Sequence, residues 1–285
     1  MNERSYLVGL VAPGTDFSVS SALQQREADR HELRYLCRHL GAARDFGTLL
    51  DECRVFGFSG LGMAASAGRP TDALDGLSRA AARTGTVTTV VYDTDGRATG
   101  HDAGMSAFTD AFARNLPDAP LSRVVQVGAT GAGVSAAHAL AERGVEHLTL
   151  VDPDPQRATA LAEAVNRHAP GRPATGRGTE DLDRHLGEAD GLVDALPGAA
   201  GSDRLVRMLA AGLRGDLWVC DLGHRPGDTS LLRAARALGC PVLRSGSLLV
   251  HAAAHTFHLV TGRPAHTSHM LGDFADLTAA PAAHS

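Results

Sequence analysis

The chain has 285 residues, of which 44% are hydrophobic, and its formal net charge is −5 at pH 7. This length favours two domains, and a chain without a basic run is not expected to bind nucleic acid. It contains neither a run of about 18 apolar residues nor a charged-then-apolar leader, so we expect no membrane span, no secretion and a cytoplasmic location.

Strands and helices are predicted to alternate through the first 116 residues, as in an α/β domain. Apolar runs predict strands at 5–12, 33–39, 58–64 and 86–92. Helices are expected at 20–31, 46–56, 71–83 and 102–115. Pro117 and Pro120 then indicate a boundary, so we expect the first domain to span residues 1–116.

Residues 123–152 have the pattern of a dinucleotide-binding βαβ unit: a strand, a glycine-rich turn, a helix and a second strand that ends in an acid. Gly128 permits the tight turn, and Gly133 lets the helix pack on its strand. A pyrophosphate would lie against the helix N-terminus, where free N–H groups favour anions. Asp152 would accept the ribose hydroxyls and repel a 2′-phosphate, so NAD is favoured over NADP.

One position departs from the G-x-G-x-x-G pattern. Thr130 replaces the middle glycine and brings a β-branched side chain to the place where the backbone approaches pyrophosphate. Gly131, beside it, would compensate by shifting the register. The alternative interpretation is that these glycines only form a tight turn between strand and helix.

The second half of the chain continues the alternation. Strands are predicted at 190–195, 217–222 and 241–244, and Trp218 within the second of these is expected in the core. Helices are predicted at 155–168, 179–187, 202–212 and 229–238. We expect the nucleotide domain to span 117–246, and the remaining segment, 247–285, to hold two helices at 247–260 and 266–276.

All 27 basic side chains are arginines, and the chain contains no lysine. A lysine Schiff base and a lysine general acid or base are therefore impossible. The four cysteines lack C-x-x-C spacing, so neither a zinc ribbon nor a disulfide framework is expected.

The order of elements resembles the shikimate and quinate dehydrogenase family from Tyr6 to Phe274. The segments that carry this resemblance are YLVGL with Ser18 and Ser20, GFSGLG at 57–62, TVTTVVYDTDGRATGHD at 86–102, the nucleotide turn, DLGHRP and TSLLRAARALGC within 221–240, and the helix ending in Thr261-Gly262. The resemblance implies an N-terminal α/β substrate domain, a Rossmann domain for NAD(P), and C-terminal helices that pack back on the first domain.

The resemblance also implies hydride transfer between a substrate hydroxyl carbon and nicotinamide. In the family, a lysine from an Asn-x-Thr-x-Pro-x-Lys loop and an aspartate from an Asn-Thr-Asp helix start act together in proton transfer. Here the lysine position is Gly68 and the aspartate position is Gly104, while the asparagine before it has become Asp102. We therefore expect that shikimate is not the substrate.

Other family contacts to the substrate are replaced as well. A family asparagine corresponds to Thr88 and the pocket tyrosine to His224, whereas Ser18 and Ser20, which hold the carboxylate in the family, are kept. Arg69 follows the lost lysine position and is a candidate for binding a carboxylate or phosphate. The substrate-binding residues predicted from this comparison are Ser18, Ser20, Arg69 and Thr88.

Two titratable residues are candidates for catalysis. Asp102 would act as a base, and His224 as a general acid or base near neutral pH. Both residues, like Arg69, have an alternative interpretation. Asp102 would only cap the helix that follows, His224 would be a solvated loop histidine, and Arg69 would be a surface charge.

The cofactor side of the pattern is better preserved. Its positions are the nucleotide turn, two acids and an arginine after the second strand, the end of the 190–195 strand, and a glycine that the family places near the nicotinamide. The predicted cofactor-binding residues are Gly128, Ala129, Thr130, Gly131, Ala132, Gly133, Asp152, Asp154, Arg157, Ala195, Leu196, Pro197 and Gly246.

His251, His255 and His258 share one face of the 247–260 helix. No carboxylate or cysteine accompanies them nearby in the sequence, so we expect no metal site.

The leading hypothesis is a diverged family member that binds NAD and performs a redox step on a small carboxylated or cyclic substrate, in secondary metabolism. A non-redox lyase or isomerase that uses Asp102 and His224, and a binding or regulatory pseudoenzyme, are the alternatives. We expect a small-molecule substrate as partner and a monomer or homodimer as the assembly.

Overall fold

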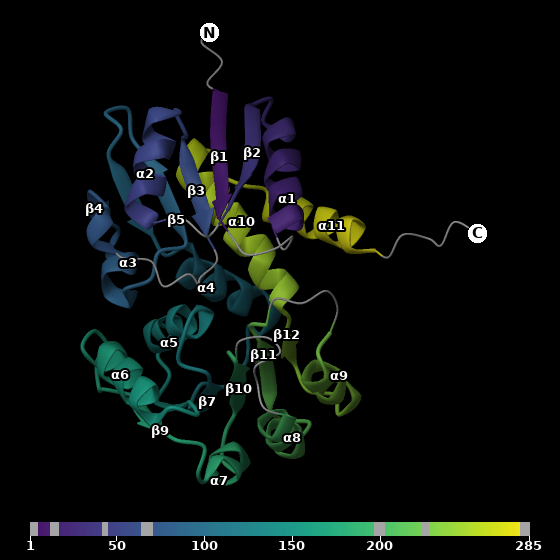
Figure 1. The fold of residues 1–285 in the computed structure, drawn as a ribbon. Helices are drawn as coiled ribbons and strands as arrows, with labels where there is room; N and C mark the ends of the chain where they lie inside the picture. Colours follow the sequence, from purple (N-terminus) through teal and green to yellow (C-terminus); the bar gives the residue numbers. More distant parts are fainter. Residues whose placement is uncertain are drawn as a thin grey trace. The chain divides into compact units, whose positions relative to one another are not determined.

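The computed structural model describes residues 5–11, 17–41, 45–63, 71–196, 203–223 and 228–279. Within these ranges it confirms the predicted α/β class, with two sheets of six strands each (Figure 1). The chain forms two compact units: the first consists of residues 1–103 and 249–285, and the second of residues 104–248. No helix in the described ranges is long and apolar enough to cross a membrane.

A mixed sheet in the order β2-β1-β3-β5-β6-β4 forms the centre of the first unit. β1 runs parallel to β2 and β3, whereas β5 is antiparallel to β3 and β6. The strands are β1 (Ser5–Val11), β2 (Arg34–Leu40), β3 (Gly60–Met63), β4 (Gly76–Leu77), β5 (Thr89–Tyr92) and β6 (Ala98–His101). The helices of its N-terminal part are α1 (Phe17–Arg30), α2 (Phe46–Val55) and α3 (Arg79–Thr84).

The second unit has a fully parallel sheet in the order β12-β11-β10-β7-β8-β9. Numbered from its own first strand, this is the doubly wound order 3-2-1-4-5-6 of dinucleotide-binding domains. The strands are β7 (Arg123–Val127), β8 (His147–Val151), β9 (Ala174–Arg177), β10 (Gly191–Asp194), β11 (Trp218–Asp221) and β12 (Val242–Leu243). The helices are α5 (Ala132–Glu142), α6 (Pro155–Asn166), α7 (Leu182–Gly187), α8 (Asp203–Ala211) and α9 (Ser230–Ala237).

The predicted helix at 71–83 is wrong. The chain instead forms a 3₁₀ turn at Thr71–Ala73, then β4 and α3. Helix α3 begins only after Ser78, whose Oγ accepts a hydrogen bond from Ala81 N at 3.2 Å and so caps a new N-terminus. The alanine-rich composition suggested one continuous helix, but the glycine and serine before α3 break it.

Besides β4, two further strands were not predicted, β6 and β9. Each has four residues and begins Ala-Thr-Gly, so neither shows an apolar run. β6 pairs with β5 after a tight turn in which Gly96 has a φ of 76°. β9 packs closely under α6, because a Cβ on Gly176 would lie 2.5 Å from the backbone carbon of Ala158.

Helices α10 (Ser245–Thr261) and α11 (Thr267–Thr278) complete the first unit, as predicted for the C-terminal helices. Val260 of α10 fills the space above Gly60, where a Cβ would lie 2.7 Å from its Cγ2. The hydroxyl oxygens of Thr89 and Thr256 lie 2.9 Å apart in the core.

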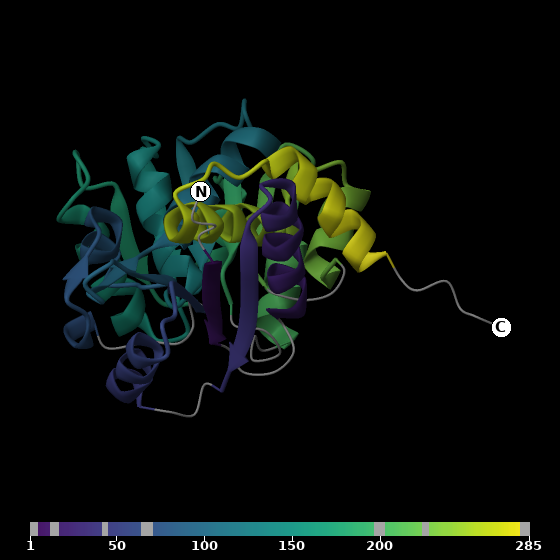
Figure 2. The same cartoon turned by 90° about the horizontal axis from the view of Figure 1, so that it is seen from above.

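Ion pairs attach α11 to α1, and the two helices lie side by side in Figure 2. Asp273 accepts from Arg26 at 3.1 Å and from Arg30 at 2.5 Å. Burial raises the pKa of Asp273, but its hydrogen bonds from Arg30 and Arg26 outweigh this and hold the pKa below its usual value. Burial likewise raises the pKa of Glu27 on α1, and hydrogen bonds from His266 and Arg30 reverse that effect and lower it.

Helix α4 (Ala103–Asn115) explains why the units divide at residue 103 rather than at the predicted boundary, 116. Phe112 of α4 makes an edge-to-face contact with Trp218 of β11 at a centroid distance of 5.1 Å. Trp218 is 1% exposed and donates its indole N–H to Pro120 O at 2.8 Å. Pro117 and Pro120 therefore follow a helix that already packs on the parallel sheet of the second unit.

We expect the Asp273→Asn variant to lose about 1–2 kcal/mol of unfolding free energy at neutral pH, because Arg26 and Arg30 each lose one charged partner. The folded-state pKa values of Asp273 and Glu27 are depressed, so the stabilisation is present above the unfolded-state values and lost as the pH falls through the folded-state ones. The difference between wild type and variant should therefore shrink below about pH 4.

Urea unfolding followed by circular dichroism over a pH series measures this difference. Asp276→Asn is the matched control, since Asp276 lies on the same helix, is 78% exposed and comes only within 4.0 Å of Arg26. A difference between wild type and Asp273→Asn that stays constant into acid would contradict the assignment.

Candidate functional site

The turn after β7 requires glycine at its first position. Gly128 has a φ of 104°, a conformation that L side chains rarely adopt. A Cβ there would also lie 2.6 Å from the carbonyl carbon of Ala195 and closer still to its oxygen. Ala195 is held in place by its own N–H, which donates to Val127 O at 2.7 Å. The backbone after β7 therefore contacts the backbone after β10 directly.

Gly133 allows α5 to approach this turn. A Cβ on Gly133 would lie 2.6 Å from Gly128 O and 2.9 Å from the Cβ of Ala195. Beneath both glycines lies Gln126, which is fully buried and donates from Nε2 to Gly128 O at 2.9 Å and to Gly133 O at 2.8 Å. The sequence analysis did not single out Gln126. The available signal was one amide among the valines of β7.

Thr130 does not block the turn. After Gly128, the next residue with a positive φ is Gly131, at 55°, so Thr130 does not itself adopt a left-handed backbone. The side chain of Thr130 is exposed. Gly131 is the N-cap of α5 and forms no side-chain capping bond. The N-terminus of α5, which begins at Ala132, therefore has no side-chain cap, and helix ends of this kind favour anions.

Asp152, after β8, is tied to the turn. It is 4% exposed, and its Oδ2 accepts from Ala129 N at 2.9 Å. Its Oδ1 accepts from Asp154 N at 2.9 Å and from the guanidinium of Arg157 at 2.9–3.1 Å. The carboxylate is therefore largely engaged by the chain, with acceptor capacity left mainly on Oδ2.

Two further charged groups lie next to Asp152. The Arg157 side chain is 53% exposed, which leaves a cation available beside the carboxylate. Asp154 caps α6 by accepting from Gln156 N at 3.0 Å, so its role in the structure is local.

The remaining predicted cofactor residues lie at other points of the second unit. Leu196 follows Ala195 and donates its N–H to Asp194 Oδ1 at 3.0 Å. Gly246 is in the first turn of α10 and is partly buried. Pro197 falls outside the described residues.

In the first unit the structure brings Thr88 and Asp102 together. Thr88 precedes β5, and its Oγ1 accepts from Ala103 N, the residue after Asp102, at 2.8 Å. Asp102 is 2% exposed and follows β6. Met63 N, at the end of β3, donates to Thr88 O at 2.8 Å, so three strand ends meet here.

The other predicted substrate and catalytic residues are only partly described. Ser20 is buried on α1, and its Oγ accepts from Gln24 Nε2 at 3.2 Å. The side chain of Ser18, all of Arg69 and all of His224 fall outside the described residues.

His101, the last residue of β6, is a titratable group that the sequence analysis did not single out. It is partly buried, and burial lowers the pKa of its imidazole below the usual value. It is therefore neutral at physiological pH and able to accept or donate a proton. The signal available in the sequence was its position directly before Asp102.

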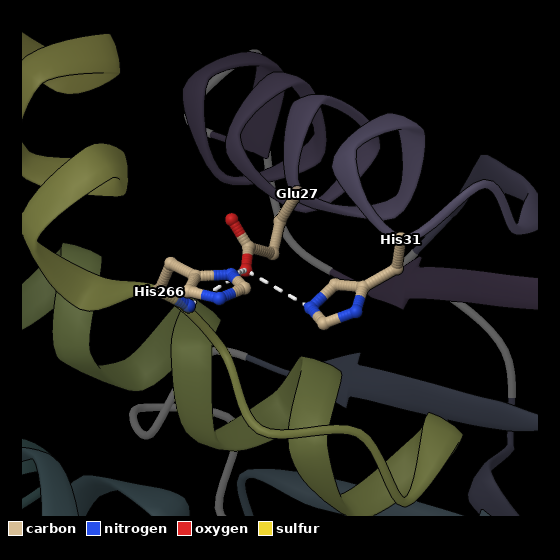
Figure 3. A group of neighbouring side chains, drawn as sticks. All are labelled: Glu27, His31 and His266. Carbon is tan, nitrogen blue, oxygen red and sulfur yellow. Dashed lines mark hydrogen bonds and ion pairs between the residues drawn. The ribbon is translucent and has the colours of Figure 1, made fainter.

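The three histidines of α10 do not form a cluster on their own. His251 is buried, His255 is partly buried, and His258 is exposed with its Nδ1 3.0 Å from Arg263 O. Within the described ranges, a group with metal-ligand spacing is instead Glu27, His31 and His266, from two other segments (Figure 3). Sequence spacing gave no sign of it, since His266 lies 239 residues from Glu27.

These features define a two-unit α/β protein with a Rossmann-type nucleotide-binding unit and a mixed-sheet unit completed by C-terminal helices. A scan against models of protein families returns no match. Individual proteins do match. The chain is 43% identical over 284 residues to a shikimate dehydrogenase (NADP(+)) of Streptomyces avermitilis, with 97% of both chains covered.

A quinate/shikimate dehydrogenase (NAD(+)) of Corynebacterium glutamicum is 36% identical over 288 residues, covering 97% of this chain and 100% of that one. The solved quinate dehydrogenase from Corynebacterium glutamicum in complex with NAD superposes with a TM-score of 0.85 at 33% identity, over 95% of this chain and 99% of that chain. The chain therefore belongs to the shikimate/quinate dehydrogenase family. This confirms the predicted membership, while the divergence of the catalytic residues stays a prediction.

We expect Gly128→Ala to abolish dinucleotide binding, because the new Cβ would strain the backbone and push Ala195 away from the turn. Isothermal titration with NAD and NADP measures the loss. Gly144→Ala is the matched control: Gly144 lies just beyond α5 with a φ of 87°, but a Cβ there would meet nothing within 4 Å. It should cost about 1 kcal/mol of stability and keep binding. Equal binding by both variants would contradict the proposed turn geometry.

Proposed function

We propose that this protein is an NAD-dependent oxidoreductase that acts on a small carboxylated or cyclic substrate other than shikimate. The observation that carries the proposal is a contrast between two sites. The close backbone packing of the nucleotide turn supports dinucleotide binding, whereas the chain has no lysine at all. The predicted place in secondary metabolism stays a prediction.

The cofactor part of the proposal is supported by the fit of the second unit to a dinucleotide. The switch in strand order between β7 and β10, the glycine backbone at Gly128 and Gly131, and the uncapped N-terminus of α5 suit a pyrophosphate. A bound nicotinamide would supply or accept the hydride. The chain's own groups then have to handle the accompanying proton.

The choice of NAD over NADP is supported by Asp152. A carboxylate beside the adenosine ribose accepts its hydroxyls and repels a 2′-phosphate. Arg157 opposes this preference, because its half-exposed guanidinium is paired with the same carboxylate and would attract the phosphate. The relatives include both an enzyme named for NADP(+) and one named for NAD(+). We infer that the intact Asp152–Arg157 pair leaves NAD favoured.

A substrate other than shikimate is supported by the sequence at the proton-transfer positions. Gly68 and Gly104 stand where the family pattern has its lysine and aspartate. Asp102 is buried where β6 ends, next to the Thr88 hydroxyl that holds Ala103 N. We assign Asp102 as the proton acceptor, with His224 as the second candidate group.

The nucleotide preference is tested by titrating the protein with NAD, NADH, NADP and NADPH. We expect NAD or NADH to bind more tightly than the phosphorylated forms. Asp152→Ala removes the repelling carboxylate and leaves Arg157 free, so the ratio of NADP to NAD affinity should rise at least about tenfold, or about 1.4 kcal/mol.

The ratio of the two affinities is informative even if Asp152→Ala weakens the binding of both nucleotides, because the variant also loses the hydrogen bond from Ala129 N. Asp190→Ala is the matched control: Asp190 precedes β10 at the opposite end of the sheet and accepts from Arg123 N at 2.7 Å. An unchanged ratio would remove Asp152 from nucleotide selection. Absence of binding by all four nucleotides would overturn the cofactor assignment.

The substrate proposal is tested with shikimate and quinate, followed at the absorbance band of reduced nicotinamide. We expect turnover about 10²–10⁴-fold below that of a lysine-containing family member assayed alongside, because positioned acid–base catalysis is worth that much. The double variant Gly68→Lys with Gly104→Asp should raise turnover, whereas each single variant should not. Wild-type turnover equal to that of the reference enzyme would refute the proposal.

A further inference from the structure

A buried glutamate and two histidines meet where α1 contacts the segment between α10 and α11. Figure 3 shows Glu27 on α1, His31 directly after the end of α1, and His266 on that segment, with both imidazoles directed toward the carboxylate. Glu27 Oε1 lies 2.8 Å from His266 Nδ1 and 3.3 Å from His31 Nε2. All three ligand atoms lie within 4.8 Å of one another.

We propose that Glu27, His31 and His266 form a binding site for a divalent transition-metal ion of the Zn²⁺ type. The ion would occupy the space between Oε1 and the two ring nitrogens. Each histidine would bind it through a lone pair and carry its proton on the other ring nitrogen. Solvent would complete a tetrahedral set of ligands.

The distances suit this ion. Zn–N and Zn–O bonds of about 2.0–2.1 Å in a tetrahedron place neighbouring ligand atoms about 3.3 Å apart. Of the two distances from Glu27 Oε1, the 3.3 Å to His31 Nε2 matches that spacing, and the 2.8 Å to His266 Nδ1 is short enough of it for a small side-chain rotation to reach it. Two imidazoles and one carboxylate are also donors that Zn²⁺ and Cu²⁺ accept, whereas Mg²⁺ and Ca²⁺ prefer oxygen alone.

The hydrogen bonds around Glu27 favour a cation. Oε1 receives the backbone N–H of His266 at 2.6 Å and lies 2.8 Å from His266 Nδ1, whereas His31 Nε2, 3.3 Å from Oε1, also lies 3.0 Å from Pro264 O. A bound ion would take the place of the Nδ1 contact of His266 with Oε1 and of the contact of His31 Nε2 with Pro264 O. Arg30 occupies the other oxygen, Oε2, at 2.9 Å, but its charge is shared with Asp273, which it also contacts.

The site is accessible although its carboxylate is buried. Glu27 has 0% side-chain exposure, which fixes the carboxylate, while His266 is 51% and His31 16% exposed. An ion can therefore enter from the His266 side. Because the ligands come from α1, from the turn directly after it and from a segment more than two hundred residues later, the bound ion would stabilise the attachment of the C-terminal helices.

The test is isothermal titration of the tag-free full chain with Zn²⁺, beside thermal unfolding with and without the ion. We expect one equivalent to bind and the unfolding temperature to rise by about 5–10 °C at a hundredfold excess over Kd. Co²⁺ bound at the same stoichiometry should give the visible absorption of a tetrahedral complex. Mg²⁺ should produce neither effect.

Variants separate this site from the other histidines. His266→Gln and His31→Gln should each weaken Zn²⁺ binding at least about tenfold and remove the temperature shift. Glu27→Gln should do the same while still accepting the His266 N–H, and circular dichroism verifies that each variant is folded.

His269→Gln and His258→Gln are the matched controls. His269 stacks on His266 at 5.5 Å and His258 is exposed on α10, yet neither belongs to the cluster. Both variants should bind like wild type. Wild type that does not bind Zn²⁺, or a His266→Gln variant that binds it with unchanged affinity, would overturn the proposal.

Discussion

The nucleotide unit depends on one backbone contact, between Gly128 and the carbonyl of Ala195. The two residues follow neighbouring parallel strands at the point where the strand order of the sheet reverses, and the bond from Ala195 N to Val127 O sets their separation. Gln126 holds the turn from below and Asp152 from β8. The sheet therefore fixes where α5 begins, and a helix start without a side-chain cap at this place in a doubly wound sheet is where such folds receive an anion.

Much of this unit could be predicted from the sequence because the relevant signals are local. A strand, glycines at fixed offsets and a terminal acid lie within 123–152, and the structure has the strands and helix there. The role of Gln126 could not be predicted, because an amide inside an apolar strand does not reveal which carbonyls it will meet. The same holds for Asp152, whose bond to Ala129 N depends on the pairing of β7 with β8.

The mispredicted parts of the first unit are those where tertiary contacts override composition. The 71–83 segment is rich in alanine, yet Gly76 and Leu77 pair with β6, a strand too short and too polar to predict. The cluster of Glu27 with His31 and His266 was equally hidden, since only the return of the C-terminal helices to α1 assembles it. Both the mixed sheet and the candidate metal site therefore depend on contacts distant in sequence.

The arginine-only composition limits the chemistry that this family fold can perform here. Arginine keeps its charge at all physiological pH values, so it binds anions but cannot exchange a proton as a lysine can when its pKa is shifted. In the proposed oxidoreductase, the proton that accompanies hydride transfer must then pass through a carboxylate, an imidazole or water. Asp102 is buried where β6 ends, directly after a His101 whose lowered pKa keeps it neutral. Proton transfer would accordingly depend on a carboxylate, an imidazole or water, and the substrate would be one whose reaction such groups can assist.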